Sequence, residues 1–168
     1  MEIRQLTSSD AGKYWGLRLE ALQLAPEAFL TSYEDAIKRE NPIAQVESNF
    51  ATEGNYTFGA FEGDELIGVV TLLQEKAEKI QHRANIYAMY VTLKKQGAGV
   101  GEALLTEAIN KAKSIEVIEK INLSVVASNE PAKKLYTKLG FKVFGLEEKA
   151  MKLNGVYLDD EHRVLHLK

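Results

Sequence analysis

The chain contains no cysteine and only 3 prolines among its 168 residues. The lack of cysteine rules out disulfides, thiolate metal sites and a cysteine nucleophile, and with the nucleophile an acyl-cysteine intermediate. Long apolar runs are also missing: none approaches the roughly 20 residues that a membrane span needs, and residues 1–6 lack the apolar core of a signal peptide. We therefore expect a cytoplasmic protein with no membrane partner.

An excess of positive charge is absent too, because the formal net charge is −3 at pH 7. Proteins that bind nucleic acids need a basic surface to displace counterions from phosphates, so we expect no nucleic-acid partner. The composition, with 45% hydrophobic and 27% charged residues, is that of an ordinary globular protein. The length suits one full core, and we expect a single domain over residues 1–168.

Hydrophobic periodicity predicts strands and helices in alternation. We expect strands at 2–6, 56–62, 65–73, 85–92, 121–126, 141–146 and 163–167, and helices at 10–24, 42–51, 100–115 and 129–139. The segment 26–40 is polar and aromatic with weak helical character. Residues 159–162 are expected to form a solvated turn, because four consecutive residues cannot converge on one metal ion from an extended strand.

A glycine-rich turn stands between the predicted strand 85–92 and the helix that follows it. Gly97, Gly99 and Gly101 allow positive φ and a close approach of a ligand to the backbone. The first N–H groups of a helix are unpaired and carry the positive end of the helix dipole. Such a turn binds anions, most naturally a pyrophosphate.

Two familiar phosphate-binding loops do not fit this turn. A P-loop has Lys and then Ser or Thr after its last glycine, where this chain has Glu102. The dinucleotide fingerprint G-x-G-x-x-G needs its third glycine at position 102 or 104, which are Glu102 and Leu104. What remains is the spacing Gln96-x-x-Gly99-x-Gly101.

A second motif follows one helix and one strand later. It reads Asn-x-x-Ala-x-x-Leu-Tyr-x-x-x-Gly-Phe and consists of Asn129, Ala132, Leu135, Tyr136, Gly140 and Phe141. Some of these residue types also have structural explanations. Asn129 suits a helix N-cap, Gly140 suits the position after a helix end, and Tyr136 lies on an apolar helical stripe.

The two motifs, in this order, resemble the two signatures of the GCN5-related N-acetyltransferases, over roughly residues 56–145. The resemblance implies an α/β (α+β) acetyltransferase fold, a mixed twisted sheet of six to seven strands flanked by helices in the order βααβββαβαββ. In that fold two neighbouring parallel strands, here ending near Val91 and Val126, separate at their carboxyl ends. The pantetheine arm of the coenzyme enters the gap and pairs as an added strand would.

The resemblance further implies acetyl-CoA (acetyl-coenzyme A) as cosubstrate, no metal, and direct attack of a primary amine on the thioester in a ternary complex. Backbone N–H groups around Tyr90 and Val91 are the expected donors to the thioester oxygen. The residues implied to bind the coenzyme lie before the turn, in it, and on the two helices that carry the motifs: Met89, Tyr90, Val91, Gln96, Gly97, Ala98, Gly99, Val100, Gly101, Glu102, Asn129 and Lys134.

For catalysis, the resemblance implies that Tyr136 protonates the leaving thiolate. A general base must take a proton from the attacking ammonium, and Glu34 is our candidate for it. Other carboxylates on the expected acceptor side are Asp35 and Glu75. Phe29 and Tyr33, in the same early segment as Glu34, are expected to contact the acceptor.

The acceptor is open at this point, since both a small-molecule amine and a peptidyl amine fit the aromatic and acidic character of segment 26–40. A homodimer is possible by analogy with relatives. The alternative function is a non-catalytic sensor that binds coenzyme A or acyl-coenzyme A.

Overall fold

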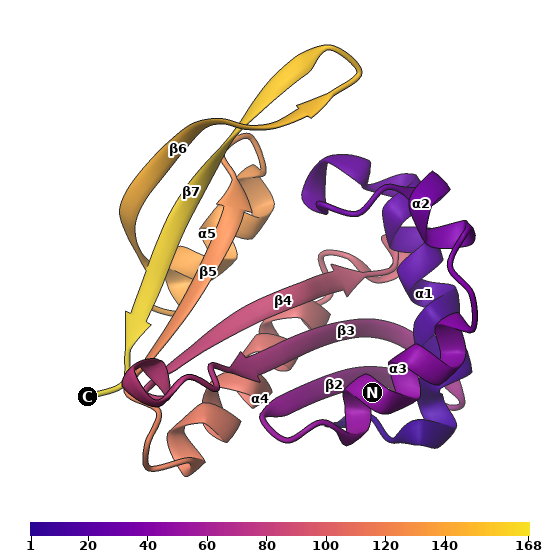
Figure 1. Ribbon diagram of the computed structural model, residues 1–168, viewed down its shortest axis with the longest axis horizontal. Coiled ribbons are helices and arrows are strands. Elements are labelled where there is room, and N and C mark those ends of the chain that lie inside the picture. The colour runs from indigo at the N-terminus through magenta and orange to yellow at the C-terminus, as the bar shows by residue number, and fades with distance from the viewer.

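The protein is built on one seven-stranded mixed sheet (Figure 1). A computed structural model describes all residues from Met1 to Lys168. The strand order is β1-β2-β3-β4-β5-β7-β6, and only β4 and β5 are parallel neighbours. The strands are β1 (Glu2–Gln5), β2 (Asn55–Glu62), β3 (Glu65–Gln74), β4 (Arg83–Val91), β5 (Lys120–Val126), β6 (Lys142–Leu153) and β7 (Val156–His166).

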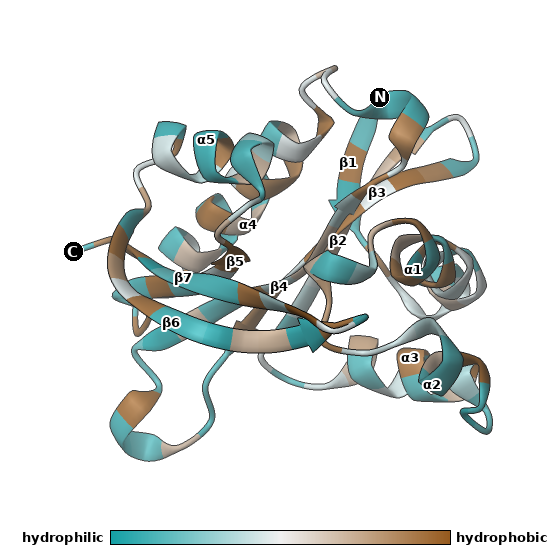
Figure 2. Ribbon diagram, turned by 90° about the horizontal axis from the view of Figure 1, so that it is seen from above, coloured by the Kyte–Doolittle hydropathy of each residue, from teal (hydrophilic) through white to brown (hydrophobic).

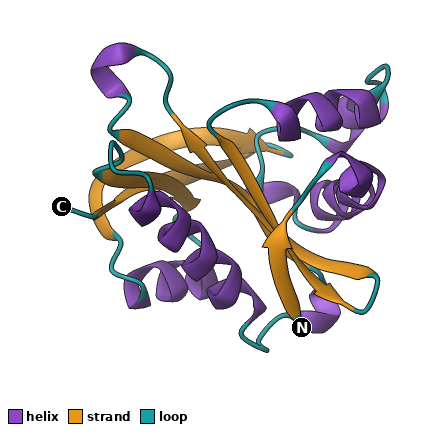
Figure 3. Ribbon diagram, turned by 90° about the horizontal axis from the view of Figure 1, so that it is seen from below, coloured by secondary structure: helices purple, strands orange, loops and turns teal.

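Helices cover both faces of the sheet, with α4 and α5 on one face and α1 to α3 on the other (Figures 2 and 3). The helices are α1 (Ala11–Leu24), α2 (Tyr33–Ile37), α3 (Pro42–Ala51), α4 (Val100–Ser114) and α5 (Glu130–Lys138). The expected mixed α/β class is confirmed. The element order differs from expectation by the short helix α2. No helix combines the length and the apolar character that crossing a membrane requires.

Two hydrophobic cores hold these layers together. The larger one lies under α4, where Leu104 and Leu105 are fully buried against Ile121 of β5. The smaller one packs Leu17 of α1 against the opposite face, beside Tyr90 of β4. Burying apolar surface contributes about 25 cal/mol per Å², so these contacts fix α1 and α4 on either side of β4.

Strand β4 departs from regular pairing as it passes Ala88. Tyr87 pairs with Thr71 of β3, and Tyr90 pairs with Val69, so two residues of β4 stand opposite a single residue of β3. Ala88 has φ of 54°, in a region that favours glycine. A bulge of this kind bends its strand and turns backbone groups in new directions.

On its other edge, β4 pairs with β5 only at its start. The parallel register covers Arg83–Asn85 and Lys120–Asn122, and it does not continue to Val91. By contrast, β5 pairs with β7 along its whole length. The strands β4 and β5 therefore diverge towards their carboxyl ends (Figure 1), and the facing backbone groups there have no strand partner.

The hairpin of β6 and β7 is longer than the sequence predicted. Its strands span 142–153 and 156–166 rather than 141–146 and 163–167. Asn154 and Gly155, with φ of 50° and 80°, form the tight turn, a pairing typical of two-residue hairpin turns. The predicted solvated turn at 159–162 is therefore wrong, because these residues lie in β7. Register shifts between Val143 and Gly145 and between Glu147 and Met151 break the alternation that marks a strand.

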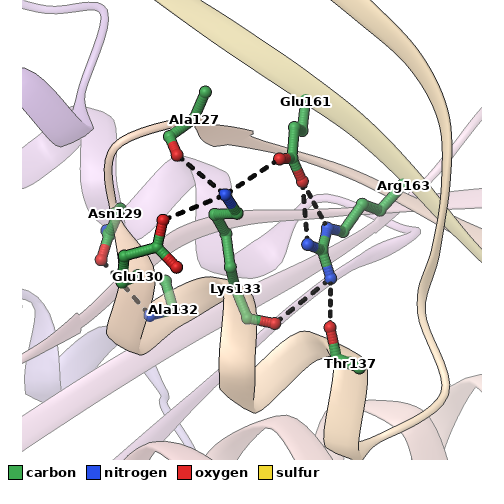
Figure 4. Close-up of polar contacts among 8 residues, drawn as sticks. All are labelled: Ala127, Asn129, Glu130, Ala132, Lys133, Thr137, Glu161 and Arg163. Atoms are coloured by element: carbon green, nitrogen blue, oxygen red, sulfur yellow. Dashed lines mark hydrogen bonds and ion pairs between the residues drawn. The ribbon is translucent and has the colours of Figure 1, made fainter.

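A polar network with Arg163 at its centre holds α5 against β7 (Figure 4). Arg163 is 5% exposed; its Nε and Nη2 donate to Glu161 Oε1 at 3.0 and 2.8 Å. Its Nη1 donates to Thr137 Oγ1 at 2.8 Å and to the carbonyl oxygen of Lys133 at 3.2 Å. Lys133 Nζ lies 3.2 Å from Glu161 Oε2. The network therefore ties two turns of α5 to one carboxylate of the hairpin.

We predict that Arg163→Met lowers the free energy of unfolding by about 3 kcal/mol, because it leaves a largely buried carboxylate with one cationic partner. The control is Lys138→Met. Lys138 is paired with Glu102 at an exposed site, where the expected loss is below about 1 kcal/mol. Equal losses in urea denaturation of the two variants would contradict this reading.

The same network predicts a pH dependence. Burial acts to raise the pKa of Glu161, but hydrogen bonds from Arg163 and Lys133 outweigh it, and the pKa lies below the ordinary 4.5. The contribution of Glu161 is thus present above pH 4.5 and is lost as the pH falls through the lowered pKa. Arg163→Met should reduce this acid sensitivity.

Candidate functional site

The turn that joins β4 to α4 presents free backbone amides. Gly97 and Gly99 have φ of 80° and 84°, and no atom lies within 4 Å of the place where a Cβ would stand at either residue. None of the N–H groups from Gly97 to Glu102 donates a hydrogen bond to the backbone. Consecutive free amides before a 15-residue helix form an anion-binding site.

Two side chains on the same turn hold it in place. Gln96 Nε2 donates to the carbonyl oxygen of Val91 at 2.8 Å and closes the turn over the end of β4. Lys95 Nζ pairs with Glu62 Oε2 at 2.5 Å. The Gln96 side chain thus shapes the turn.

Gly101, unlike Gly97 and Gly99, lies in close contact with other parts of the protein. A Cβ there would stand 3.2 Å from Met89 Cε and 3.4 Å from Leu135 Cδ2. The absence of a side chain therefore lets α4 approach both β4 and α5. Of the three glycines, Gly97 and Gly99 face open space and Gly101 faces the protein.

The remaining coenzyme candidates differ in exposure. Val100 is buried under the turn, whereas Ala98 is exposed. The Glu102 carboxylate pairs with Lys138 Nζ at 2.8 Å. Lys134 is exposed on α5 and makes no ion pair.

A cavity of about 810 Å³ occupies the gap between the diverging strands. Its walls include Ile86 to Met89 of β4 and Leu123 to Val126 of β5, so it follows the edges that lack a strand partner. Asn129, Ala132 and Tyr136 close it on the α5 side. An extended chain that carries amides fits such a gap because it can satisfy the free backbone groups.

Tyr136 lines this cavity and is largely buried. The residue is 7% exposed, packs edge-on against Phe141, and makes no side-chain hydrogen bond. Burial raises the pKa of Tyr136 to about 12. The hydroxyl therefore keeps its proton throughout the neutral range and is available as a donor.

Asn129 serves as the N-cap of α5, since its Oδ1 accepts from the N–H of Ala132 at 3.3 Å. It also lines the cavity. The capping role is therefore observed, and contact with the coenzyme is compatible with it.

Tyr90 turns its side chain away from the coenzyme side. Its hydroxyl donates to Glu20 Oε2 on α1 at 2.8 Å, and burial and this carboxylate raise its pKa. Its ring packs edge-on against Phe29. The side chain of Tyr90 therefore belongs to the α1 side of the sheet, and its backbone pairs with Val69 of β3.

The opposite wall of the cavity carries a polar cluster from β5 and from the β6–β7 hairpin. Ser124 Oγ lies 2.8 Å from His162 Nδ1, and His162 Nε2 lies 3.5 Å from Glu147 Oε1. Asp160 lines the cavity next to this cluster, and burial raises its pKa. A hydroxyl, an imidazole and a carboxylate in series can pass a proton from the cavity towards solvent.

The structure brings only some of the predicted acceptor residues to the cavity. Phe29 lines it. Glu34 and Asp35 are exposed on α2, Tyr33 begins the same helix, and none of them lines the cavity. Glu75 Oε1 accepts from Asn85 Nδ2 at 2.7 Å and also lies outside the lining.

Sequence reasoning missed Ser124, Asp160, His162 and Arg18, all of which line the cavity. The signal for His162 was the Asn-Gly pair at 154–155, which predicts a hairpin turn and hence a strand through 159–162. Nothing in the sequence distinguishes Arg18 from the other cations of α1.

Comparison with known proteins agrees with this geometry. The model of the Acetyltransferase (GNAT) family matches residues 19–141. The L-amino acid N-acetyltransferase AaaT of Escherichia coli is 31% identical over 98 residues, which are 58% of this chain and 59% of that protein. The probable N-acetyltransferase YjcK of Bacillus subtilis is 25% identical over 97% of this chain and 91% of its own length.

Among solved structures, yncA of Salmonella typhimurium, described as a putative acetyltransferase with its cofactor acetyl-CoA, has a TM-score of 0.85 at 19% identity and covers 99% of this chain and 94% of its own. This likeness shows the fold. Because the family model spans most of the sequence, the chain belongs to the Acetyltransferase (GNAT) family and is an acetyl-CoA-dependent acyltransferase.

Proposed function

We propose that the protein, as one domain over residues 1–168, is an N-acetyltransferase in which a primary amine attacks acetyl-CoA directly. The observation that carries the proposal is the continuity between the free amides of residues 97–102 and the unpaired edge of β4. A pyrophosphate on the amides leaves the attached pantetheine beside that edge. The thioester then lies near the bulge, where Ala88 lines the cavity.

The thioester carbonyl needs hydrogen-bond donors as negative charge develops on its oxygen. Backbone N–H groups around Tyr90 and Val91 are the proposed donors, because this part of β4 has no partner on the β5 side. Attack by the amine nitrogen forms the amide bond, and cleavage of the carbon–sulfur bond releases the coenzyme as a thiolate.

The leaving thiolate takes a proton from Tyr136 in this scheme. The buried hydroxyl, with its pKa raised to about 12, holds its proton until a base appears beside it. The raised pKa keeps Tyr136 in the protonated form that an acid needs, and it also makes the phenol a weaker acid than a free tyrosine.

The proton of the acceptor ammonium passes to His162 through Ser124. With Nε2 protonated towards Glu147, Nδ1 accepts the hydrogen bond from Ser124 Oγ, which faces the cavity. Glu34 stays a candidate base from the sequence, but His162 and Ser124 are better placed because both line the cavity.

For the proposed function, the first prediction concerns the binding of acetyl-CoA. Gly99→Ala should weaken acetyl-CoA binding about tenfold in isothermal titration, since a non-glycine residue at φ 84° carries strain that displaces the amides. Gly155→Ala is the matched control, because Gly155 has φ 80° and open space around it in the hairpin turn. Equal affinities of the two variants would count against the turn as the pyrophosphate site.

A second prediction tests the acid. Tyr136→Phe should lower kcat by about 10²-fold or more while acetyl-CoA affinity changes little, since only a proton donor is removed. Tyr157→Phe, at a half-exposed tyrosine of the hairpin, serves as control. A wild-type protein that binds acetyl-CoA but turns over none of a broad amine panel would favour the sensor instead.

A third prediction tests the base. His162→Gln should lower kcat/KM by about 10²-fold at pH 7. The loss should shrink as the pH approaches the pKa of the free amine, about 8 to 10, because solution then supplies the deprotonated acceptor. His166→Gln, exposed on the same strand, should be silent. A loss that is constant with pH would contradict the assignment.

A further inference from the structure

Arg18 of α1 lies between two cavities. One is the cavity between the diverging strands, and the other, of about 600 Å³, lies between α1 and α3. Ala88 at the bulge of β4 also lines both. Both cavities therefore border the bulge, beside which the proposed function places the thioester.

The charge of Arg18 has no anionic partner in the protein. Its guanidinium makes no ion pair and no hydrogen bond, and it is held over the ring of Phe29 with 4.8 Å between Cζ and the ring centroid. Burial lowers the pKa of Arg18, and the charge of Arg39 acts in the same direction. A partly buried cation without a counterion is costly, so the site suits an anion.

The residues around the second cavity strengthen this argument. Arg39 lines it, is exposed and likewise makes no ion pair. The acidic residue in the lining, Glu40, lies beyond ion-pair distance of both arginines. Glu20, two residues further along α1, is engaged by the hydroxyl of Tyr90. The two arginines therefore line one cavity, and no carboxylate of the protein pairs with either of them.

We propose that Arg18, assisted by Arg39, binds a carboxylate of the acceptor, which makes the acceptor a free amino acid. The proposal rests on the N-acetyltransferase function above. A guanidinium offers a planar fork of donors that matches a carboxylate. An α-amino acid carries its amine one carbon from that carboxylate, so anchoring the carboxylate at Arg18 presents the amine to the bulge.

The apolar lining indicates the side chains to try first. Phe29, Leu30, Phe144 and Met151 line the larger cavity, so L-methionine, L-leucine and L-phenylalanine are suitable probes. Each is compared with its amide, which keeps the amine and the side chain but lacks the carboxylate. The wild-type enzyme should acetylate the acids with kcat/KM at least about tenfold above the amides. Equal or better use of the amides, as a peptidyl acceptor requires, overturns the proposal.

Substitutions of Arg18 test whether this residue causes the preference for acids over amides. Arg18→Gln should raise KM for the acids about 10- to 100-fold and leave KM for the amides nearly unchanged. Arg18→Lys should recover part of the loss, because it keeps the charge but not the fork. Arg39→Gln, at an exposed residue, should show a smaller effect of the same kind. Lys13→Gln, also a cation of α1, is the control. A KM increase that is the same for acids and amides overturns the proposal.

A binding measurement separates this proposal from the function on which it rests. Isothermal titration with N-acetyl-L-methionine and N-acetyl-L-methioninamide needs no turnover. Tighter binding of the acid that disappears in Arg18→Gln supports the carboxylate site even if no amine is acetylated. Equal binding of the two compounds to the wild-type protein overturns it, whereas a lack of turnover with every amine defeats the transferase function alone.

Discussion

The early end of pairing between β4 and β5 is the constraint from which the rest of the site follows. Parallel pairing stops after Asn85 and Asn122, and the bulge at Ala88 bends β4 away. Backbone groups in a sheet interior are normally paired, so the two free edges leave an opening that an amide-bearing chain can fill. The same bend brings the end of β4 to the turn whose amides are free.

The cavity between β4 and β5 has two sides, and different helices and strands line each side. On the coenzyme side, α4 supplies the amides, and α5 supplies Tyr136, which the Arg163 network holds in position. On the acceptor side, β7 supplies His162 and α1 supplies Arg18. The proposed proton donor, proton acceptor and carboxylate anchor therefore line the same cavity as Ala88 of the bulge, and they come from three different elements.

The sequence predicted the parts of the site that depend on local backbone geometry. Glycines before a helix predicted the free amides, and the spacing from Asn129 to Phe141 predicted α5 with Tyr136 facing inward; the sheet and the family followed from the two motifs. The sequence did not predict what depends on long-range register. Register shifts between β6 and β7 break the alternating pattern by which a strand is recognised, so the strand that carries His162 was not predicted. The bulge in β4 lies at Ala88, and an alanine gives no sequence signal for a positive φ. Arg18 became distinctive only when packing showed that it lacks a counterion.

Amide hydrogen exchange with and without acetyl-CoA tests the central claim most directly, because it reports on individual backbone groups. If the coenzyme lies along the turn and the open strand edge, exchange should slow at residues 97–102 and at 86–91 of β4 on binding. The amides of the hairpin turn at 154–155 should be unaffected. Protection confined to other parts of the chain, with both of these segments unchanged, would contradict the account.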